Sequence, residues 1–271
     1  MSEPANEAVP AQAIGHFNER LPALFLRESF ASVWMHRMPE AGAPPIVITP
    51  DATIDLQWID GDFRIAGPDK DPQTENLPAG STVIGFRFHV AAAARWLNLP
   101  ASEILGLRLP LSDIWGRRAR LLSDRVRRWD DLAELLESLE AAIAHHDSPR
   151  QPVDPHMRAA HGLIERGSPP GVSLVPWLGR ALATSERTLR RRFDESFGYG
   201  PKTLDRLLRF QRFRRLSARS GASVAVLAAE AGYADQAHLV RESRRLTGST
   251  PGQFEQLVRQ DSGPTSRHTP H

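Results

Sequence analysis

The chain has 271 residues, of which 41% are hydrophobic, and this is enough to fill the cores of two globular domains. It contains no cysteine. Disulfides, thiolate zinc sites and cysteine nucleophiles are therefore excluded, and a reducing cytoplasm is the expected location. The sequence has no apolar run of about 18 residues, and its first residues lack the basic and apolar regions of a signal peptide, so we expect no membrane association.

The net charge of +2 conceals two halves of opposite sign. Residues 1–150 hold 15 Arg and Lys against 21 Asp and Glu, net −6, whereas residues 151–271 hold 19 against 11, net +8. A basic domain attracts the phosphate backbone of nucleic acid, and an acidic domain is repelled by it. The C-terminal half is therefore the candidate nucleic-acid binder.

The N-terminal half begins with residues 1–20, which are rich in Ala, Glu and Pro and predict a mobile tail. From Ser29 the pattern changes to short β-branched and aromatic stretches bounded by Pro, Gly or Asp, which is typical of strands. The Asp60-Gly61 pair between two of them is a hairpin signal. We predict a small antiparallel β domain from stretches at residues 29–38, 44–51, 53–60, 62–68 and 81–89.

Helical periodicity follows over residues 90–106 and 112–146, with Pro100 and Pro110 as interruptions. Residues 21–146 are thus predicted as a strand-rich sensor or dimerisation domain that ends in helices. We interpret a basic run in these helices as a solvated face paired with Asp124, Asp130 and Asp131. The run consists of Arg117, Arg118, Arg120, Arg125, Arg127 and Arg128.

The proline-rich residues 147–156 predict a stiff linker. A basic, helical domain is predicted over residues 157–260, and residues 261–271 are predicted as a disordered end. Within this domain a helical unit occurs twice, fifty residues apart, at Ser185 to Pro201 and at Asp235 to Pro251. A duplication of this length predicts two copies of one supersecondary structure.

Each copy carries signals for both ends of a helix. Ser185 and Asp235 are good N-cap residues. Gly198 and Gly248 stand where a helix would end, and a proline three residues later begins the next one. The preceding helix has a small residue at a matching place, Gly179 or Ala228, and the turn has Ala183 in the first copy and Gly232 in the second. Helix, tight turn and helix, present twice, predict two helix-turn-helix units.

The chemistry lies on the second helix of each copy. In the first copy an apolar stripe of Leu189, Phe193 and Phe197 is expected to be buried. Three arginines, Arg187, Arg190 and Arg191, fall on another face, and arginine can donate two hydrogen bonds to guanine in a major groove. The second copy offers Gln236, His238, Arg241 and Arg244. One basic cluster would indicate a solvated helix face, but its recurrence at one register favours DNA contact.

Between the copies, Lys202 to Arg219 predicts a connecting helix about 27 Å long. Successive major grooves on one side of B-DNA are about 34 Å apart. A rigid connector of this length could place two base-reading helices in successive grooves. Its predicted apolar stripe is Leu204, Leu207, Leu208, Gln211 and Leu216.

The motifs SERTLRRRFDESFGYGP and GYADQAHLVRESRRLTGSTPGQF resemble the DNA-binding domain of AraC/XylS-type transcription regulators, over about Met157 to Leu257. The resemblance implies an all-α domain of about seven helices with two helix-turn-helix units. It also implies base contacts from Arg187, Arg190, Arg191, Gln236, His238 and Arg241. Contacts to the DNA backbone are predicted for Arg192, Lys202, Arg244 and Arg245.

Two departures from the family pattern concern the second unit. Ser243 and Thr247 stand where the first unit has Phe193 and Phe197, so we expect compensation or looser packing there. Ala237 gives the second unit a short side chain at a position that could face the groove, so the first unit is expected to read more of the base sequence. Residues 50–68 and 80–100 look like the N-terminal domain of a subset of these regulators.

An enzyme is the alternative from another class. Polar residues of the strand domain offer candidate groups, but no phosphate-binding, zinc-protease or serine-hydrolase signature is present. These groups are His36, Asp51, Asp55, Arg87 and His89. Two histidine pairs, His145 with His146 and His268 with His271, could bind metal only adventitiously. The tryptophans, Trp34, Trp58, Trp96 and Trp115, are expected in the core.

We therefore predict an α+β, two-domain, non-enzymatic and cofactor-free transcription regulator that reads two successive major grooves of double-stranded DNA. Its other expected partners are a small-molecule effector at the N-terminal domain, RNA polymerase and a second copy of the chain. Two alternatives stay open. One is a catalytic or small-molecule-binding N-terminal domain fused to a DNA-targeting module, and the other is a ligand-free architectural DNA binder.

Overall fold

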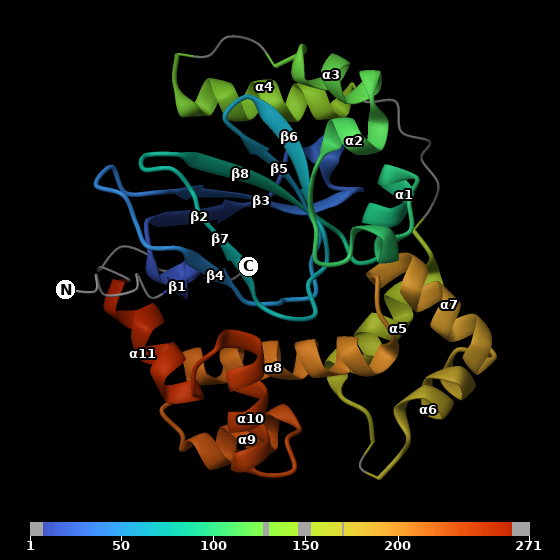
Figure 1. Cartoon of the computed structure of the whole chain (residues 1–271). Coiled ribbons are helices and arrows are strands. Elements are labelled where there is room, and N and C mark those ends of the chain that lie inside the picture. Colours follow the sequence, from blue (N-terminus) through green and yellow to red (C-terminus); the bar gives the residue numbers. More distant parts are fainter. Residues whose placement is uncertain (1–7, 127–129, 146–152, 170, 262–271) are drawn as a thin grey trace.

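The computed structural model describes residues 8–126, 130–145, 153–169 and 171–261. Two domains follow one another along the chain, a β domain with flanking helices and an all-α domain (Figure 1). This architecture confirms the predicted α+β class. No helix among the described residues is both long and apolar enough to cross a membrane.

The N-terminal domain is built on a six-stranded antiparallel sheet, in the order β2-β3-β8-β5-β6-β9. Its strands are β2 (His16–Arg20), β3 (Phe30–Arg37), β5 (Asp55–Ile59), β6 (Asp62–Ala66), β8 (Thr82–Phe88) and β9 (Arg108–Pro110). A smaller sheet has the order β1-β4-β7, from β1 (Val9–Pro10), β4 (Ile46–Ile48) and β7 (Gln73–Glu75). The predicted hairpin joins β5 to β6, with φ of 49° at Asp60 and 102° at Gly61, as a primed turn requires.

The predicted mobile tail is wrong for residues 9–20, which are ordered. Residues 9–20 form β1, a short 3-10 helix (Ala11–Ala13) and β2. In β2, Phe17 pairs with His36 of β3, and its ring stacks on Trp34 with centroids 5.9 Å apart. The order of this segment comes from pairing with a distant strand, which local composition does not reveal. Residues 1–7 lie outside the described part.

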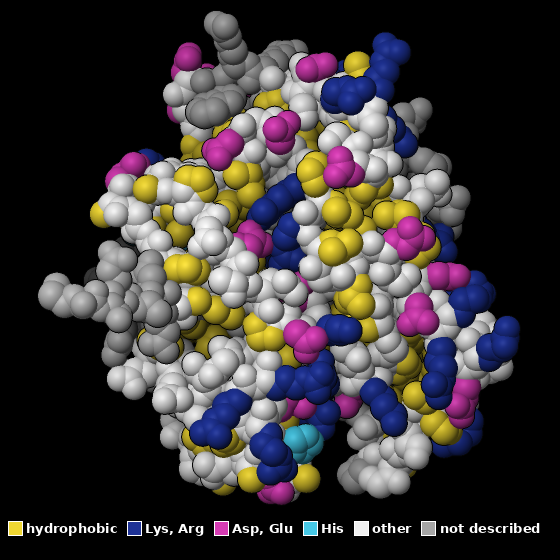
Figure 2. All heavy atoms as spheres, viewed as in Figure 1, with side chains coloured by type: hydrophobic (Ala, Val, Ile, Leu, Met, Phe, Trp, Pro, Cys, Tyr) yellow, Lys and Arg dark blue, Asp and Glu magenta, His cyan; other side chains and the backbone are white. Residues whose placement is uncertain are grey.

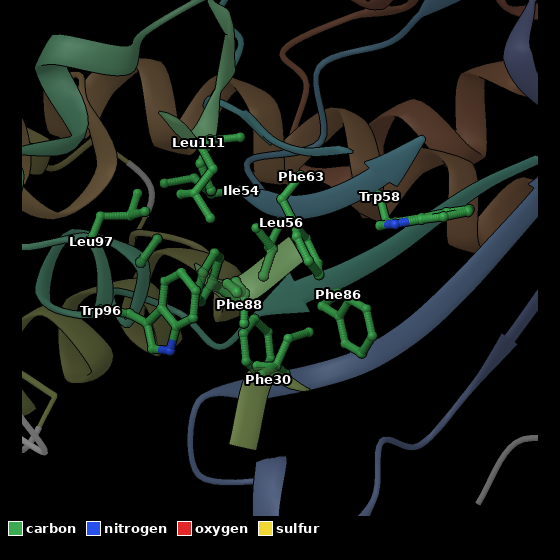
Figure 3. Packing of buried hydrophobic residues seen from close by; sticks show 14 of the residues in the cluster. Phe30, Ile54, Leu56, Trp58, Phe63, Phe86, Phe88, Trp96, Leu97 and Leu111 are labelled. Atoms are coloured by element: carbon green, nitrogen blue, oxygen red, sulfur yellow. The ribbon is translucent and has the colours of Figure 1, made fainter. Parts of the chain in front are cut away.

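Four helices cover one face of the large sheet (Figure 1). They are α1 (Ala93–Leu97), α2 (Leu111–Trp115), α3 (Arg117–Ser123) and α4 (Leu132–Ala144). The core beneath them is aromatic, because the ring of Phe30 lies 4.6 Å from Phe88, 5.8 Å from Phe86 and 5.7 Å from Trp96 (Figure 3). Trp34 and Trp58 are also buried, and Trp115 packs against this core, as predicted. The described arginines of the basic run are exposed.

The C-terminal domain consists of seven helices within the described residues, which confirms the predicted fold. They are α5 (Pro155–Arg166), α6 (Leu174–Ala181), α7 (Glu186–Phe197), α8 (Pro201–Arg219), α9 (Val224–Ala231), α10 (Gln236–Thr247) and α11 (Pro251–Asp261). Helix α5 begins within the predicted linker, because Asp154 caps it by accepting from the His156 amide at 2.9 Å and Pro155 occupies its first position. The rest of that linker, residues 147–152, and the predicted end after Asp261 lie outside the described part.

The two domains contact each other directly. Gln211 on α8 donates to the carbonyl oxygen of Pro50 at 3.1 Å, and Arg206 donates to that of Lys70 at 2.8 Å. Ala91 is buried within the hydrophobic cluster of the C-terminal domain. At the end of α7, a Cβ on Gly198 would lie 2.8 Å from the carbonyl oxygen of Ala101. The β domain is thus seated on α7 and α8.

Candidate nucleic-acid interface

Helix α7 is the second helix of the first unit, which comprises α6 and α7. The side chain of Ser185 accepts from the Thr188 amide at 3.2 Å, and Gly198 ends the helix in the left-handed region at φ 77°. Leu189, Phe193 and Phe197 are all buried. The predicted caps and buried stripe are therefore confirmed.

Helix α10 occupies the same place in the second unit, which comprises α9 and α10. Asp235 accepts from the His238 amide at 2.6 Å, and Gly248 ends the helix at φ 77°. These contacts reproduce those of α7 at the predicted offset. We call α7 and α10 the reading helices.

The turns inside the two units also correspond. The Thr184 amide donates to the carbonyl oxygen of Gly179 in the first unit, and the Tyr233 amide donates to that of Ala228 in the second, each at 2.9 Å. A Cβ on Gly179 would lie 3.0 Å from the carbonyl oxygen of Thr184, which explains the small residue there. Both helix-turn-helix units are thus present.

The three arginines predicted to read bases in the first unit are exposed. Arg190 lies 3.8 Å from Glu186, and Arg191 lies 2.6 Å from Glu195. Exposed ion pairs one helical turn apart contribute little to stability. The guanidiniums of Arg190 and Arg191 can therefore exchange these partners for DNA.

The second unit presents a different set of side chains. Gln236 and Arg241 are exposed, whereas His238 is half-buried. The His238 ring lies edge-on to Tyr233, with centroids 5.2 Å apart, and its Nε2 is 3.9 Å from Glu242. Figure 2 shows Lys and Arg side chains gathered over the helical domain, in the lower part of the view.

The residues predicted to contact the DNA backbone fall into two groups. Lys202 and Arg244 are exposed. Arg192 lies 3.8 Å from Asp154, and its side chain is only 29% exposed. Arg245 lies 3.5 Å from Asp71 of the N-terminal domain. Arg192 and Arg245 thus have protein partners that a phosphate would have to replace.

Ser243 and Thr247 compensate for the missing phenylalanines by hydrogen bonding. Both side chains are buried. The Ser243 hydroxyl donates to the carbonyl oxygen of Ser249 at 2.9 Å, and the Thr247 hydroxyl accepts from the Ser249 amide at 3.1 Å. These bonds tie the end of α10 to the turn that follows it.

A buried polar contact in the second unit was not predicted. The Tyr233 hydroxyl donates to Glu242 Oε1 at 2.8 Å, and both residues are buried. Burial, and then the neighbouring Glu242 charge, raise the pKa of Tyr233. A sequence signal existed, because a glutamate replaces the basic Arg192 of the first unit at the same register.

The apolar stripe predicted for α8 is incomplete. Phe210 and Phe213 are buried and were omitted, whereas Gln211 faces the N-terminal domain instead of the helical core. The arginines of α8 turn toward protein groups as well. Arg209 lies over the Tyr233 ring at 5.2 Å.

The polar candidates of the strand domain form ion pairs. Arg87 lies 3.2 Å from Asp55 and 3.4 Å from Asp51. Burial raises the pKa of Asp55, although the Arg87 charge opposes this shift. His36 and His89 contact backbone carbonyls, at 2.6 and 2.9 Å.

No cluster of three or more metal-ligating side chains occurs among the described residues. His145 bonds the carbonyl oxygen of Ala141 at 2.7 Å. The other histidines of the two predicted pairs, His146, His268 and His271, lie outside the described part.

Residues 178–256 match a family model described as a helix-turn-helix domain. The C-terminal domain is an AraC-type helix-turn-helix domain. The chain is accordingly a DNA-binding transcription regulator, as predicted. In the N-terminal domain, residues 18–110 match the model of a domain of unknown function (DUF6597).

Solved structures that resemble the chain show low sequence identity to it. ToxT from Vibrio cholerae O395 is 13% identical, with a TM-score of 0.47 over 89% of this chain and 98% of that one. A probable AraC family transcriptional regulator from Rhodopseudomonas palustris is 20% identical, with a TM-score of 0.33 over 41% of this chain and 100% of that one. No curated protein matches the chain.

Proposed function

We propose that this AraC-type regulator reads two successive major grooves of one DNA duplex, with α7 in one groove and α10 in the next. The supporting observation is that both reading helices are the same capped unit on one shared core, each with exposed polar side chains in its first turns. The connecting helix α8 has 19 residues. At about 1.5 Å per residue α8 is about 28 Å long, against a separation of about 34 Å between successive major grooves on one side of B-DNA.

Within this proposal, the first unit reads guanines through Arg187, Arg190 and Arg191. Arg241 does the same in the second unit, and Gln236 suits adenine because its amide can both donate and accept. His238 presents a single partly exposed ring. Lys202, Arg192, Arg244 and Arg245 hold the phosphates and set the position of the protein on DNA.

For the N-terminal domain we propose a sensor or assembly role, with a small-molecule effector, a second copy of the chain or RNA polymerase as its partner. Its contacts with α8 and its ion pair with Arg245 connect any change in that domain to the DNA-binding domain. The alternatives predict different results. Turnover of a substrate by this chain would favour a catalytic domain, and an unchanged melting temperature across a panel of small molecules would favour an architectural binder.

The central experiment is selection of binding sites from random DNA by the purified full chain, followed by footprinting. We expect two conserved sub-sites whose centres lie about 10 base pairs apart on one face of the duplex. A selected site with only one sub-site, or no enrichment, would contradict the two-groove proposal.

Arg191→Ala tests the assignment within α7. Loss of a bidentate base contact should weaken binding to the selected site by about 1–3 kcal/mol and relax the preference at one base pair. The measurement is fluorescence anisotropy on the selected site, on variants of each base pair and on random DNA. The matched control is Arg120→Ala, which changes an exposed arginine on α3, and helix α3 lies far from both reading helices in Figure 1. Equal losses on specific and random DNA would assign Arg191 to the phosphates instead.

A further inference from the structure

The guanidinium of Arg212, on α8, donates hydrogen bonds to backbone carbonyl oxygens at the ends of two other helices. Its Nη1 donates to the carbonyl oxygen of Ala231 at the end of α9, at 2.7 Å. Its Nη2 donates to the carbonyl oxygen of Ile164 at 3.1 Å and to that of Glu165, both in the last turn of α5. Helix α5 packs against α7 of the first unit, and α9 belongs to the second. One side chain therefore joins the two halves of the DNA-binding domain.

Both helix ends that receive the Arg212 guanidinium stop at a glycine. Gly167 follows α5 with φ 94°, and Gly232 follows α9 with φ 92°. A Cβ on Gly167 would lie 3.9 Å from Nη2, and one on Gly232 would lie 3.5 Å from Nη1. The last carbonyls of a helix lack intrahelical partners and carry a partial negative charge. A single guanidinium between two such ends satisfies carbonyls of both.

The neighbouring arginines of α8 lie in the same row, three residues apart. Arg215 lies 3.4 Å from Glu165 of α5, and Arg209 packs on Tyr233 of the second unit. Burial lowers the pKa of Arg212, yet an arginine stays charged at neutral pH. The planar fork of Arg212 fixes direction as well as distance, which a lysine ammonium does not.

We infer that Arg212 is a positioning residue that sets the distance and rotation between the two reading helices, and so determines which spacing of the two DNA sub-sites is accepted. This inference rests on the proposed two-groove function. Helix α8 follows α7 through a short turn, and Arg209 and Arg212 near its middle contact the end of α9 and the turn after it. The bonds from Arg212 to α5 and α9 oppose movement of these two helices relative to each other.

The test compares the full-length protein with its Arg212→Met and Arg212→Lys variants. Methionine keeps much of the apolar stem and removes every donor, whereas lysine keeps the charge but cannot reproduce the fork. Arg219→Ala, at the exposed end of α8, is the matched control. Dissociation constants are measured on the selected site, on sites with two base pairs inserted or deleted between sub-sites, and on a duplex with one sub-site.

We expect the affinity of the unchanged protein and of the Arg219→Ala control to fall about tenfold or more when the spacing is altered, because the two units can no longer bind one duplex at the same time. The affinity of the Arg212→Met variant should fall by less than about threefold when the spacing is altered, and its affinity for the duplex with one sub-site should be unchanged. Arg212→Lys should fall between the two.

The outcomes separate the two claims. If the unchanged protein binds all spacings equally, the two-groove function itself fails. If it discriminates spacing and both Arg212 variants discriminate as strongly, the role of Arg212 is overturned while the proposed function stands. Arg212→Lys decides the matter if the methionine variant does not fold. If the Arg212→Lys variant binds the duplex with one sub-site and the sites of every spacing more weakly by the same factor, Arg212 serves stability alone. This result also overturns the inference.

Discussion

The two helix-turn-helix units share one backbone design but are held together by different chemistry. In the first unit the rings of Phe193 and Phe197 pack with centroids 5.1 Å apart. In the second unit Ser243 and Thr247 occupy the same register and hydrogen bond to the following turn. The caps and the helix-ending glycines are common to both. The ends of the helices therefore define the unit, and its interior tolerates either aromatic packing or a satisfied polar network.

The largest difference in stability between the two units is expected at the aromatic position. Phe193→Ala removes a fully buried ring and should lower the free energy of unfolding by about 3–5 kcal/mol. The matched change, Ser243→Ala, removes one hydrogen bond and should lower it by only about 1 kcal/mol. Urea unfolding of the full chain, followed by circular dichroism, gives both values. Losses of equal size would show that the two interiors are energetically alike.

Tyr233→Phe probes the polar interior of the second unit. It leaves the buried Glu242 carboxylate without the hydroxyl donor and should lower the free energy of unfolding by about 1–3 kcal/mol. Because the pKa of Tyr233 is raised in the folded state, its stabilising contribution is complete below about pH 10, the pKa of an unfolded tyrosine, and is lost as the pH rises above that value. Stability should therefore fall less steeply above about pH 10 in the variant than in the unchanged protein.

Tyr199 controls for this alkaline effect. Burial raises the pKa of Tyr199 as well, so its contribution to the pH dependence stays in both proteins. Urea unfolding of both proteins at a series of alkaline pH values gives the two slopes. Identical slopes would show that Tyr233 ionises as easily in the folded as in the unfolded chain.

The smallest effects are expected in the turns. Ala183 has a φ of 48° and Gly232 a φ of 92°, so both turns enter the left-handed region, where a Cβ is unfavourable. Gly232→Ala should lower the free energy of unfolding by about 1–2 kcal/mol. Ala183→Gly should raise it by only about 0.5 kcal/mol, since the relief of strain is partly offset by the greater freedom of glycine in the unfolded chain. Thermal unfolding measures both, and a loss of stability in Ala183→Gly would show that the first turn is not strained.

Sequence patterns predicted features whose causes are local. The N-caps Ser185 and Asp235, the glycines that end the reading helices and the Asp60-Gly61 hairpin all follow from neighbours within a few residues. The duplication added the correspondence between the units. Exposure of Arg187, Arg190 and Arg191 followed from helical periodicity alone. Their contacts to DNA stay a prediction.

Contacts between residues far apart in the chain were not predictable in this way. The composition of residues 9–20 indicated a tail, but pairing with β3 makes β2 a strand. Nothing near Arg245 in sequence points to Asp71, and nothing near Arg212 shows that its guanidinium meets the ends of both α5 and α9.

Two capped, arginine-bearing helical units that follow a strand-rich domain were predictable from the sequence, because caps, turns and periodicity depend on residues close to one another in the chain. Which of the other arginines join helices and domains, as Arg212 and Arg245 do, is set by the folded structure. An arginine looks the same in the sequence whether it faces solvent or joins two helices, because its partners are determined by packing between segments that are far apart in the chain.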